Sequence, residues 1–141
     1  MTRHITTAQT TSVAHPSQFF ARWADVASWP KWSADIAWAR LDAPFAVGSS
    51  GVLKPKKGLK TRVVIEHLEP ERLYVDVSRL PGARLTFHHA VTPREGGCTI
   101  EVRVWIDGRA ARVWSRQLGE GFRNSTPADL DRLVTVVEAG P

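Results

Sequence analysis

The chain has 141 residues and a mass of 15.7 kDa, enough for one domain with its own core and too little for two. Hydrophobic residues make up 43% and charged residues 23% of the sequence, an ordinary balance that excludes a largely disordered chain. The net charge of +5 comes from arginines and lysines spread along the whole chain, and no nucleic-acid-binding motif accompanies them, so we expect no nucleic-acid partner.

The N-terminal sequence MTRHITTAQ lacks the apolar core of a signal peptide, and no window approaches the roughly 20 apolar residues of a membrane span. We therefore expect a cytoplasmic protein without stable membrane insertion; monomer and homodimer both remain open. Cys98 is the only cysteine, which excludes an internal disulfide and a multi-cysteine metal site. Its place beside Ile100, on the apolar face of an alternating segment, predicts a buried, inert thiol.

A threonine-rich segment with alternating side chains, residues 4–13, predicts the first strand. Pro16 then suits the first turn of a short helix with an aromatic buried side. That side consists of Phe19, Phe20 and Trp23. A second short helical piece is expected over residues 25–29, and Pro30 closes it or starts a further turn.

Six further segments are expected to form strands, because side chains of different polarity alternate along most of them. Turn-forming glycine, proline and acidic residues separate most of these segments, and such short connections favour antiparallel pairing. The expected strands are residues 36–41, 51–55, 59–68, 72–78, 84–92 and 98–107.

Residues 108–138 predict one long amphipathic helix. Pro127 interrupts the pattern, so the helix is expected to kink or restart near Thr126. The apolar stripe consists of Ala110, Val113, Trp114, Leu118 and Phe122, followed by Leu130, Leu133, Val134 and Val137. Such a stripe needs a broad apolar partner, and the strands upstream can supply one.

The elements together indicate an α+β protein with a single domain over residues 1–141. Their order is a strand, two short helices, six strands and the long helix. About seven antiparallel strands should form a curved sheet with one concave apolar face. The C-terminal helix is the only element long enough to cover that face.

This order, together with the segment DVASWPKWSADI over residues 25–36, resembles the polyketide cyclase/dehydrase and lipid transport family. That family belongs to the START-like (Bet v1-like) helix-grip superfamily. Further similarities are a Trp-Pro-x-Trp stretch at residues 29–32, a Gly-Gly turn at residues 96–97 and the terminal pattern of Leu130, Leu133 and Glu138. The resemblance implies a cavity between the curved sheet and the long helix, closed at one end by the short helices and holding a small apolar ligand.

His89 is the most informative single residue. Alternation along residues 84–91 places it on the apolar face with Leu85, Phe87 and Val91, as a polar group in an apolar lining. There it can bind a ligand through a hydrogen bond or act as an acid or base. The alternative is a histidine satisfied by backbone or water.

Six tryptophans offer flat surfaces for a ring-shaped ligand or ordinary core packing, and we favour Trp32 and Trp114 as lining residues. Trp105 lies on the polar face of its strand, where a partner subunit could cover it. The residues expected to line the cavity are Trp29, Trp32, Trp38, Val63, Ile65, Val75, Leu85, Phe87, His89, Val102, Val104, Val113, Trp114, Leu118 and Phe122.

We expect no metal and no cofactor. His88 and His89 point to opposite faces of one strand and cannot chelate one ion together, and no third ligand accompanies His67. A glycine-rich phosphate loop and a nucleophile elbow are both missing from the sequence.

Three functions remain. The first is binding of a small hydrophobic molecule such as a lipid, polyketide or aromatic metabolite. The second is an aromatase or cyclase in which His89, with Tyr74 or Arg84, moves protons; paired acid and base groups are not apparent. The third is a protein-interaction module that uses Trp105 and the lysine-rich turn at residues 54–60. That turn is otherwise a solvated loop, with contact to an anion or acidic partner as the alternative.

Overall fold

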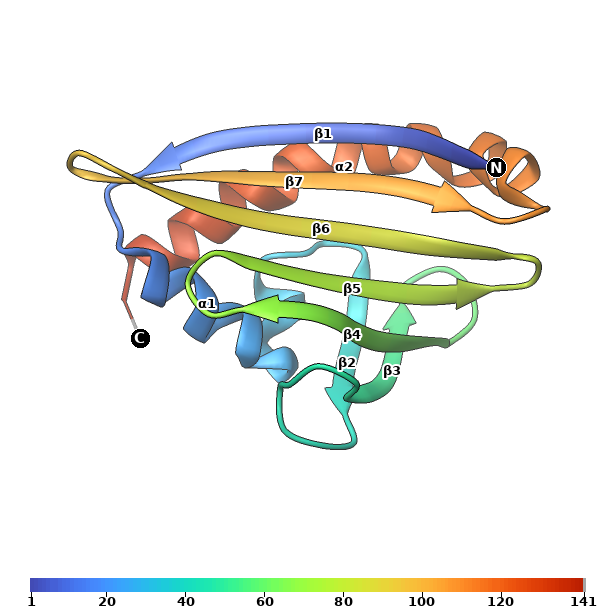
Figure 1. Ribbon diagram of the computed structural model, residues 1–141, viewed down its shortest axis with the longest axis horizontal. Coiled ribbons are helices and arrows are strands. Elements are labelled where there is room, and N and C mark those ends of the chain that lie inside the picture. Colours follow the sequence, from blue (N-terminus) through green and yellow to red (C-terminus); the bar gives the residue numbers. More distant parts are fainter. Residues whose placement is uncertain (141) are drawn as a thin grey trace.

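The computed structural model describes residues 1–140. One seven-stranded sheet curves around the helices, and the long C-terminal helix runs along the sheet (Figure 1). The elements in chain order are β1 (Thr2–Ser12), α1 (Pro16–Ala24), the 3-10 helix η1 (Val26–Lys31), β2 (Ile36–Leu41), β3 (Ser50–Pro55), β4 (Thr61–Glu69), β5 (Leu73–Leu80), β6 (Ala83–Arg94), β7 (Gly97–Asp107) and α2 (Ala111–Glu138). This is the expected α+β helix-grip order.

The strands lie in the order β1-β7-β6-β5-β4-β3-β2, and every neighbouring pair is antiparallel. The chain therefore places its first strand beside its last. Three irregularities break the register, near Ile5 in β1, Ala37 in β2 and Glu66 in β4. Bulges of this kind bend a strand and increase its twist, which helps the sheet to curve.

Helix α1 begins where Pro16 and the His15 cap predispose the chain to a helix. The His15 side chain accepts a hydrogen bond from the backbone of Ser17, and the Gln18 side chain accepts one from the backbone of His15. Trp23 of α1 is fully buried. The indole N–H of Trp29 in η1 donates to the Trp23 carbonyl oxygen over 3.0 Å, which holds η1 against α1.

Helix α2 has 28 residues, about 42 Å at the usual rise, and it continues through Pro127 without restarting. Proline in a helix interior costs about 3 kcal/mol. Burial of Leu130, Leu133 and Val137 beyond the proline offsets that cost. Of the two expected outcomes near Thr126, a kink or a restart, the restart does not occur.

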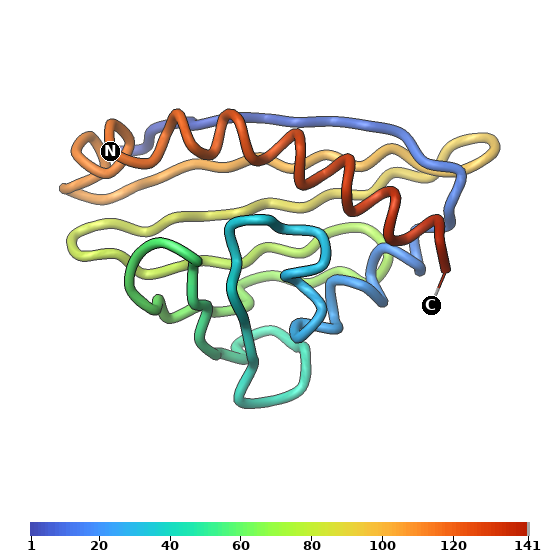
Figure 2. Tube along the Cα trace, turned by 180° about the vertical axis from the view of Figure 1, so that it is seen from behind, coloured from blue at the N-terminus to red at the C-terminus, as the bar shows by residue number. Residues whose placement is uncertain are grey.

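The face that α2 buries differs from the expected stripe. Its buried residues are Ala111, Gly119, Thr126, Leu130, Leu133 and Val137, whereas Val113 is 63% exposed. The helix packs chiefly along β1 and less against β7 and β6. Figure 2 shows its course from behind. On the first half of α2 the side that faces the sheet carries the small residues Ala111 and Gly119. The larger Trp114, Leu118 and Phe122 lie on the flank of the helix and are only partly buried.

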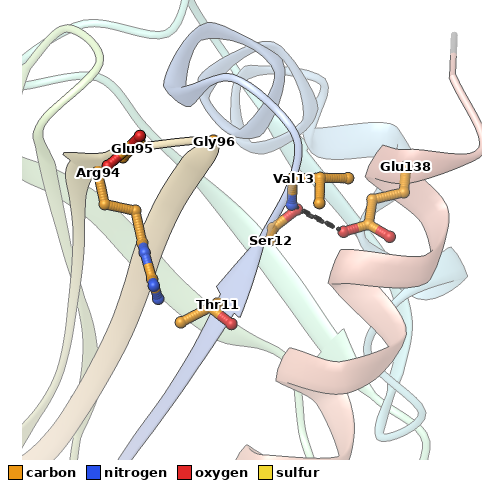
Figure 3. Close-up of a pocket in the computed structure, with 7 residues that line it drawn as sticks. All are labelled: Thr11, Ser12, Val13, Arg94, Glu95, Gly96 and Glu138. Atoms are coloured by element: carbon orange, nitrogen blue, oxygen red, sulfur yellow. Dashed lines mark hydrogen bonds between the residues drawn. The ribbon is translucent and has the colours of Figure 1, made fainter.

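Side-chain hydrogen bonds hold the second half of α2. Ser12 Oγ at the end of β1 donates to Glu138 Oε2 over 2.6 Å (Figure 3). Ser33 Oγ, after η1, donates to Asp129 Oδ2 over 2.9 Å, and the Ala34 N–H donates to the other oxygen of the same carboxylate. The C-terminal half of the helix is therefore attached both to the edge strand and to the short helices.

The first half of α2 has one side-chain hydrogen bond to the sheet. Trp114 Nε1 donates to the carbonyl oxygen of Pro81 over 2.8 Å, in the turn between β5 and β6. Gly82 completes this turn with φ of 72°, and a Cβ atom there would lie 2.9 Å from the Cβ of Ala110. The turn therefore needs glycine both for its backbone conformation and for its close approach to the start of α2.

Candidate functional site

A polar cluster lies inside the sheet, on strands β5 and β6. Tyr74 pairs with His89 across the two strands, and Asp76 lies two residues beyond Tyr74 on the same face. Tyr74 is 1%, Asp76 5% and His89 5% exposed. Because buried polar groups are costly unless they are paired, three of them side by side in a core need an explanation.

The three side chains are arranged as a stack with one hydrogen bond. The Tyr74 hydroxyl donates to Asp76 Oδ2 over 2.6 Å. The Tyr74 ring stacks on the His89 imidazole, with centroids 4.1 Å apart and planes 7° from parallel. His89 Nδ1 lies 3.2 Å from the Tyr74 carbonyl oxygen, and since a carbonyl can only accept, Nδ1 carries the proton. Neutral His89 therefore presents Nε2 as a hydrogen-bond acceptor.

Burial shifts the pKa values of this cluster strongly. It raises the pKa of Asp76 from 3.8 to about 7, although the hydrogen bond from Tyr74 acts in the opposite direction. Burial, and next the neighbouring Asp76 charge, raise the pKa of Tyr74 well above its usual value. Burial lowers the pKa of His89 to about 3, so its imidazole is neutral at physiological pH. Asp76 is the one group of the three that titrates near neutrality.

Aromatic side chains surround the cluster. The Trp23 ring lies 5.4 Å from the Tyr74 ring and 5.3 Å from His89, and Phe45 packs edge-on against Tyr74 at 5.4 Å. Trp23 Nε1 is buried and has no hydrogen-bond partner within residues 1–140; the same is true of Trp32 Nε1. An unpaired buried donor costs about 1–3 kcal/mol, so the interior holds unused hydrogen-bonding capacity beside the cluster.

An apolar surface adjoins the cluster on the side of α2. Phe87 of β6 is stacked beside His89 at 6.3 Å and contacts Phe122 of α2 edge-on at 5.4 Å. Phe87, Trp114, Leu118 and Phe122 are all partly exposed. We call these four residues the apolar strip. Although Phe87 is on the inner face of a central strand, solvent reaches it, so the first half of α2 leaves this face incompletely covered.

Most of the expected lining residues lie on the inner side. Nine of the expected residues are buried: Val75, and on the inner side Trp29, Trp32, Val63, Ile65, Leu85, His89, Val102 and Val104. Of the expected set, the structure brings His89 and Phe87 next to Tyr74 and Asp76, and Trp114, Leu118 and Phe122 onto the flank of α2. Three others need correction.

Val75, Trp38 and Val113 do not line the interior. Val75 pairs with His88 and therefore points to the outer face, although it is buried there. Trp38 is 37% exposed and pairs with Lys54 on the side of β2 opposite the buried Ala39. Val113 is exposed because α2 turns Ala111 towards the sheet instead. In each case the apolar residue was assigned to the wrong side of its element.

Asp76 is the functional candidate that sequence reasoning missed. On β5 the apolar Val75 and Val77 point to the outer face, where they are nevertheless buried, and the polar Tyr74, Asp76 and Ser78 point to the inner face, so the usual polarity of a strand is reversed. A register that pairs Tyr74 with His89 would have revealed this, since His89 was already placed inside. Arg84, named beside Tyr74 as a cyclase candidate, forms an ion pair with Glu66 on the outer face and does not approach the cluster.

Trp105 is partly covered by its own chain. It lies on the outer face, where the Arg103 guanidinium stands 5.8 Å from its ring centroid and the His88 ring 5.9 Å away. Burial, and next the Arg103 charge, lower the pKa of His88. A partner subunit is therefore not required to explain this tryptophan.

Two hollows in the protein surface lie elsewhere. One, of about 250 Å³, lies between the end of β1, the β6–β7 turn and Glu138 (Figure 3). The other, of about 570 Å³, lies between the β1–α1 connection and the same turn. Neither is lined by any of the residues expected to form the ligand cavity. Their position at the attached end of α2 separates them from the polar cluster and the apolar strip.

The fold and this interior can now be compared with known proteins. Residues 3–138 match the family model described as polyketide cyclase / dehydrase and lipid transport. The chain belongs to this family. The match confirms the family resemblance found in the sequence and spans nearly the whole domain.

Several solved structures share the fold at low sequence identity. One protein, MLL2253 from Mesorhizobium loti, has 15% identity and a TM-score of 0.74, covering 100% of this chain and 99% of that chain. Norcoclaurine synthase from Thalictrum flavum, in truncated form, has 10% identity and a TM-score of 0.75, covering 100% and 96%. No curated protein matches the chain in sequence.

A third structure is a di-domain protein, the aromatase/cyclase StfQ of the steffimycin biosynthetic pathway. It has 13% identity and a TM-score of 0.78, and the match covers 99% of this chain and 51% of that one. At these identities the likeness concerns the helix-grip fold.

Two negative observations complete the site. Within the described residues, no group of three histidine, cysteine or acidic side chains is arranged to hold a metal ion. None of the helices over residues 1–140 is long and apolar enough to cross a membrane.

Proposed function

We propose that the protein binds a small, largely apolar molecule with one hydrogen-bonding oxygen group. The apolar body would contact the apolar strip, and the oxygen group would reach Asp76 and His89. The observation that carries this proposal is the buried Tyr74–Asp76–His89 cluster beside Trp23, whose indole N–H lacks a partner. Buried polar side chains do not strengthen an apolar core, whereas a bound ligand could form hydrogen bonds with them and with the Trp23 indole N–H.

The chemistry of the cluster favours a hydroxyl or enol group on the ligand. Neutral His89 offers an acceptor at Nε2, and Asp76 offers an acceptor oxygen beyond the one that Tyr74 occupies. Trp23 Nε1 supplies a donor. A phenol or an enolised ketone both donates and accepts, so it matches this set better than a plain hydrocarbon. The family description and the aromatase/cyclase likeness support a ligand of this kind.

The test compares two probes of equal size. In fluorescence titrations of the full chain, 2-naphthol should bind about tenfold more tightly than 2-methylnaphthalene, since one good hydrogen bond is worth about 1.4 kcal/mol. Asp76→Ala should remove this preference. His88→Ala is the matched control for His89→Ala, because His88 is its neighbour on the opposite face, and only the inner variant should weaken naphthol binding. Equal affinity for both probes in the wild-type protein would refute the proposal.

A second candidate function is proton transfer at carbon, as a cyclase requires. The observation that favours it is Asp76, whose pKa of about 7 lets its carboxyl group act as a base or an acid near neutral pH. As carboxylate, Asp76 would take a proton from a carbon next to a ketone, leaving an enolate. The enolate carbon would then attack a second carbonyl carbon of the same chain. The proton held by Asp76 would return to the oxygen of that carbonyl.

The acid–base hypothesis has its own readout. Wild-type protein should accelerate exchange of the α-protons of 2-tetralone in D₂O, followed by NMR, and Asp76→Asn should abolish the acceleration. His88→Ala should leave it unchanged. Binding of 2-naphthol without any acceleration of exchange would leave the protein as a carrier and exclude the second function.

A further inference from the structure

The end of the molecule where α2 begins is strongly basic. Three lysines of the β3–β4 turn, Lys56, Lys57 and Lys60, are exposed. So are three arginines around the first turns of α2, namely Arg109, Arg112 and Arg116. The two segments lie far apart in the sequence and at the same end of the molecule in both views (Figures 1 and 2).

These six cations are not neutralised. None of them forms an ion pair with a carboxylate of residues 1–140, whereas Arg40 and Arg62 nearby are paired with Asp42. Asp35 adjoins the turn through a hydrogen bond from the Lys56 N–H to its backbone carbonyl, but its carboxylate pairs with no lysine there. Residues 54–62 and 108–119 contain no aspartate or glutamate. The six side chains carry six positive charges, more than the net charge of +5 of the whole chain.

Helix α2 begins against its own electrostatic preference. Its first turn contains no acidic residue, and Ala110 provides no side-chain cap. Arginines at the positive end of a helix dipole are unfavourable, and the dipole adds to the positive potential of this end. The arginines at this helix start are therefore unfavourable for the helix alone, and they would be favourable against an external anionic surface.

Exposed aliphatic side chains stand among these cations. Leu59 is 87% exposed at the tip of the lysine turn, and Val113 is 63% exposed between Arg112 and Arg116. Lys54 donates to the carbonyl oxygens of Pro55 and Gly58 over 2.6 and 2.9 Å, which holds the turn that presents Leu59. Trp38 is also exposed here, with the Lys60 ammonium 5.9 Å from its ring centroid.

We propose that this basic end docks on the surface of an anionic lipid bilayer. Cations flanking an exposed leucine, valine and tryptophan match a surface with negatively charged headgroups above an apolar layer. A nucleic acid would pair with the cations and leave Leu59 and Val113 in water. The docked face lies beside Trp114, at the incompletely covered half of α2. The inference does not depend on the proposed ligand.

The test is flotation of the full chain with vesicles. It should bind vesicles of phosphatidylcholine with 30% phosphatidylglycerol at low salt, and bind neither pure phosphatidylcholine vesicles nor the anionic vesicles in 0.5 M NaCl. Each lysine near the surface is worth roughly fivefold in affinity. The double variant Lys56→Glu/Lys57→Glu should therefore weaken binding by at least about 25-fold.

Two controls separate a bilayer site from general positive charge. Arg72→Glu/Arg94→Glu changes the net charge equally at the opposite end of the molecule and should leave vesicle binding nearly intact. Leu59→Ser should weaken vesicle binding about fivefold or more without affecting binding to a polyanion such as heparin. The proposal would be overturned if the wild-type protein did not bind vesicles, or if both charge variants lost vesicle binding equally. It would also be overturned if Leu59→Ser bound vesicles as tightly as the wild-type protein.

Discussion

The two halves of α2 carry similar apolar residues and bury them differently. The second half buries Leu130, Leu133 and Val137 and is attached through Asp129 and Glu138. The first half buries only alanine and glycine, and its larger side chains remain partly exposed above the polar cluster. We conclude that the second half stabilises the fold and that the first half leaves the apolar strip partly exposed.

The largest expected effect tests this division directly. Leu133 is 1% exposed, so Leu133→Ala should lower the free energy of unfolding by about 2–5 kcal/mol. Leu118→Ala removes the same atoms from a partly exposed position and should cost less than about 1 kcal/mol. Urea denaturation monitored by circular dichroism measures both. Equal losses would show that the two halves contribute alike.

The polar cluster beside the first half should make stability depend on pH. Folded Asp76 has a pKa of about 7, against an ordinary 3.8, so the folded state keeps a proton that the unfolded state releases. The contribution of Asp76 to the free energy of unfolding is therefore fully present below pH 4 and is lost as the pH rises to about 7, by on the order of 4 kcal/mol. Asp76→Asn should remove this contribution, which urea denaturation of the variant and the wild-type protein between pH 4 and 8 measures as a difference.

His89 acts in the opposite direction in the same experiment. Its folded pKa is about 3, so as the pH falls below 6.5 the unfolded state gains a proton that the folded state does not. Stability is lost on acidification, and this loss should be exposed in the Asp76→Asn variant. Asp129, whose pKa burial raises, adds a decline of the same sign as Asp76. If Asp76→Asn did not change the dependence of the unfolding free energy on pH, the raised pKa of Asp76 would be contradicted.

The attachment of the second half should contribute a moderate amount. Asp129→Ala removes the acceptor of both Ser33 Oγ and the Ala34 N–H, and should cost about 1–2 kcal/mol. Ser33→Ala in the Asp129→Ala background should add little, because the bond is already lost. A fully additive double variant would mean that the two side chains do not interact.

The smallest effect is expected at Val113. Because this side chain is 63% exposed, Val113→Ala should change the unfolding free energy by less than about 0.5 kcal/mol. Thermal unfolding of the variant beside wild type measures it. A loss above 1 kcal/mol would mean that the first half of α2 is buried in solution, contrary to the contrast between the halves.

Much of the local structure was predictable from short-range chemistry. The helix at Pro16, the strand over residues 36–41 and the turn at Pro81 and Gly82 follow from proline geometry, alternation and glycine conformation. His89 was placed inside because its strand alternates clearly. The functional interior was less predictable, since Asp76 is on a strand whose polarity is reversed.

The sequence by itself determined the family, the order of elements and the long terminal helix, because these depend on spacing within a segment. Only the tertiary structure decided which side of β5, β2 and α2 faces inward. That choice depends on strand register and helix rotation, which contacts between distant segments set. For this reason alone, Tyr74 and His89 meet across two strands, and the β3–β4 turn and the start of α2 lie at one end of the molecule (Figure 1).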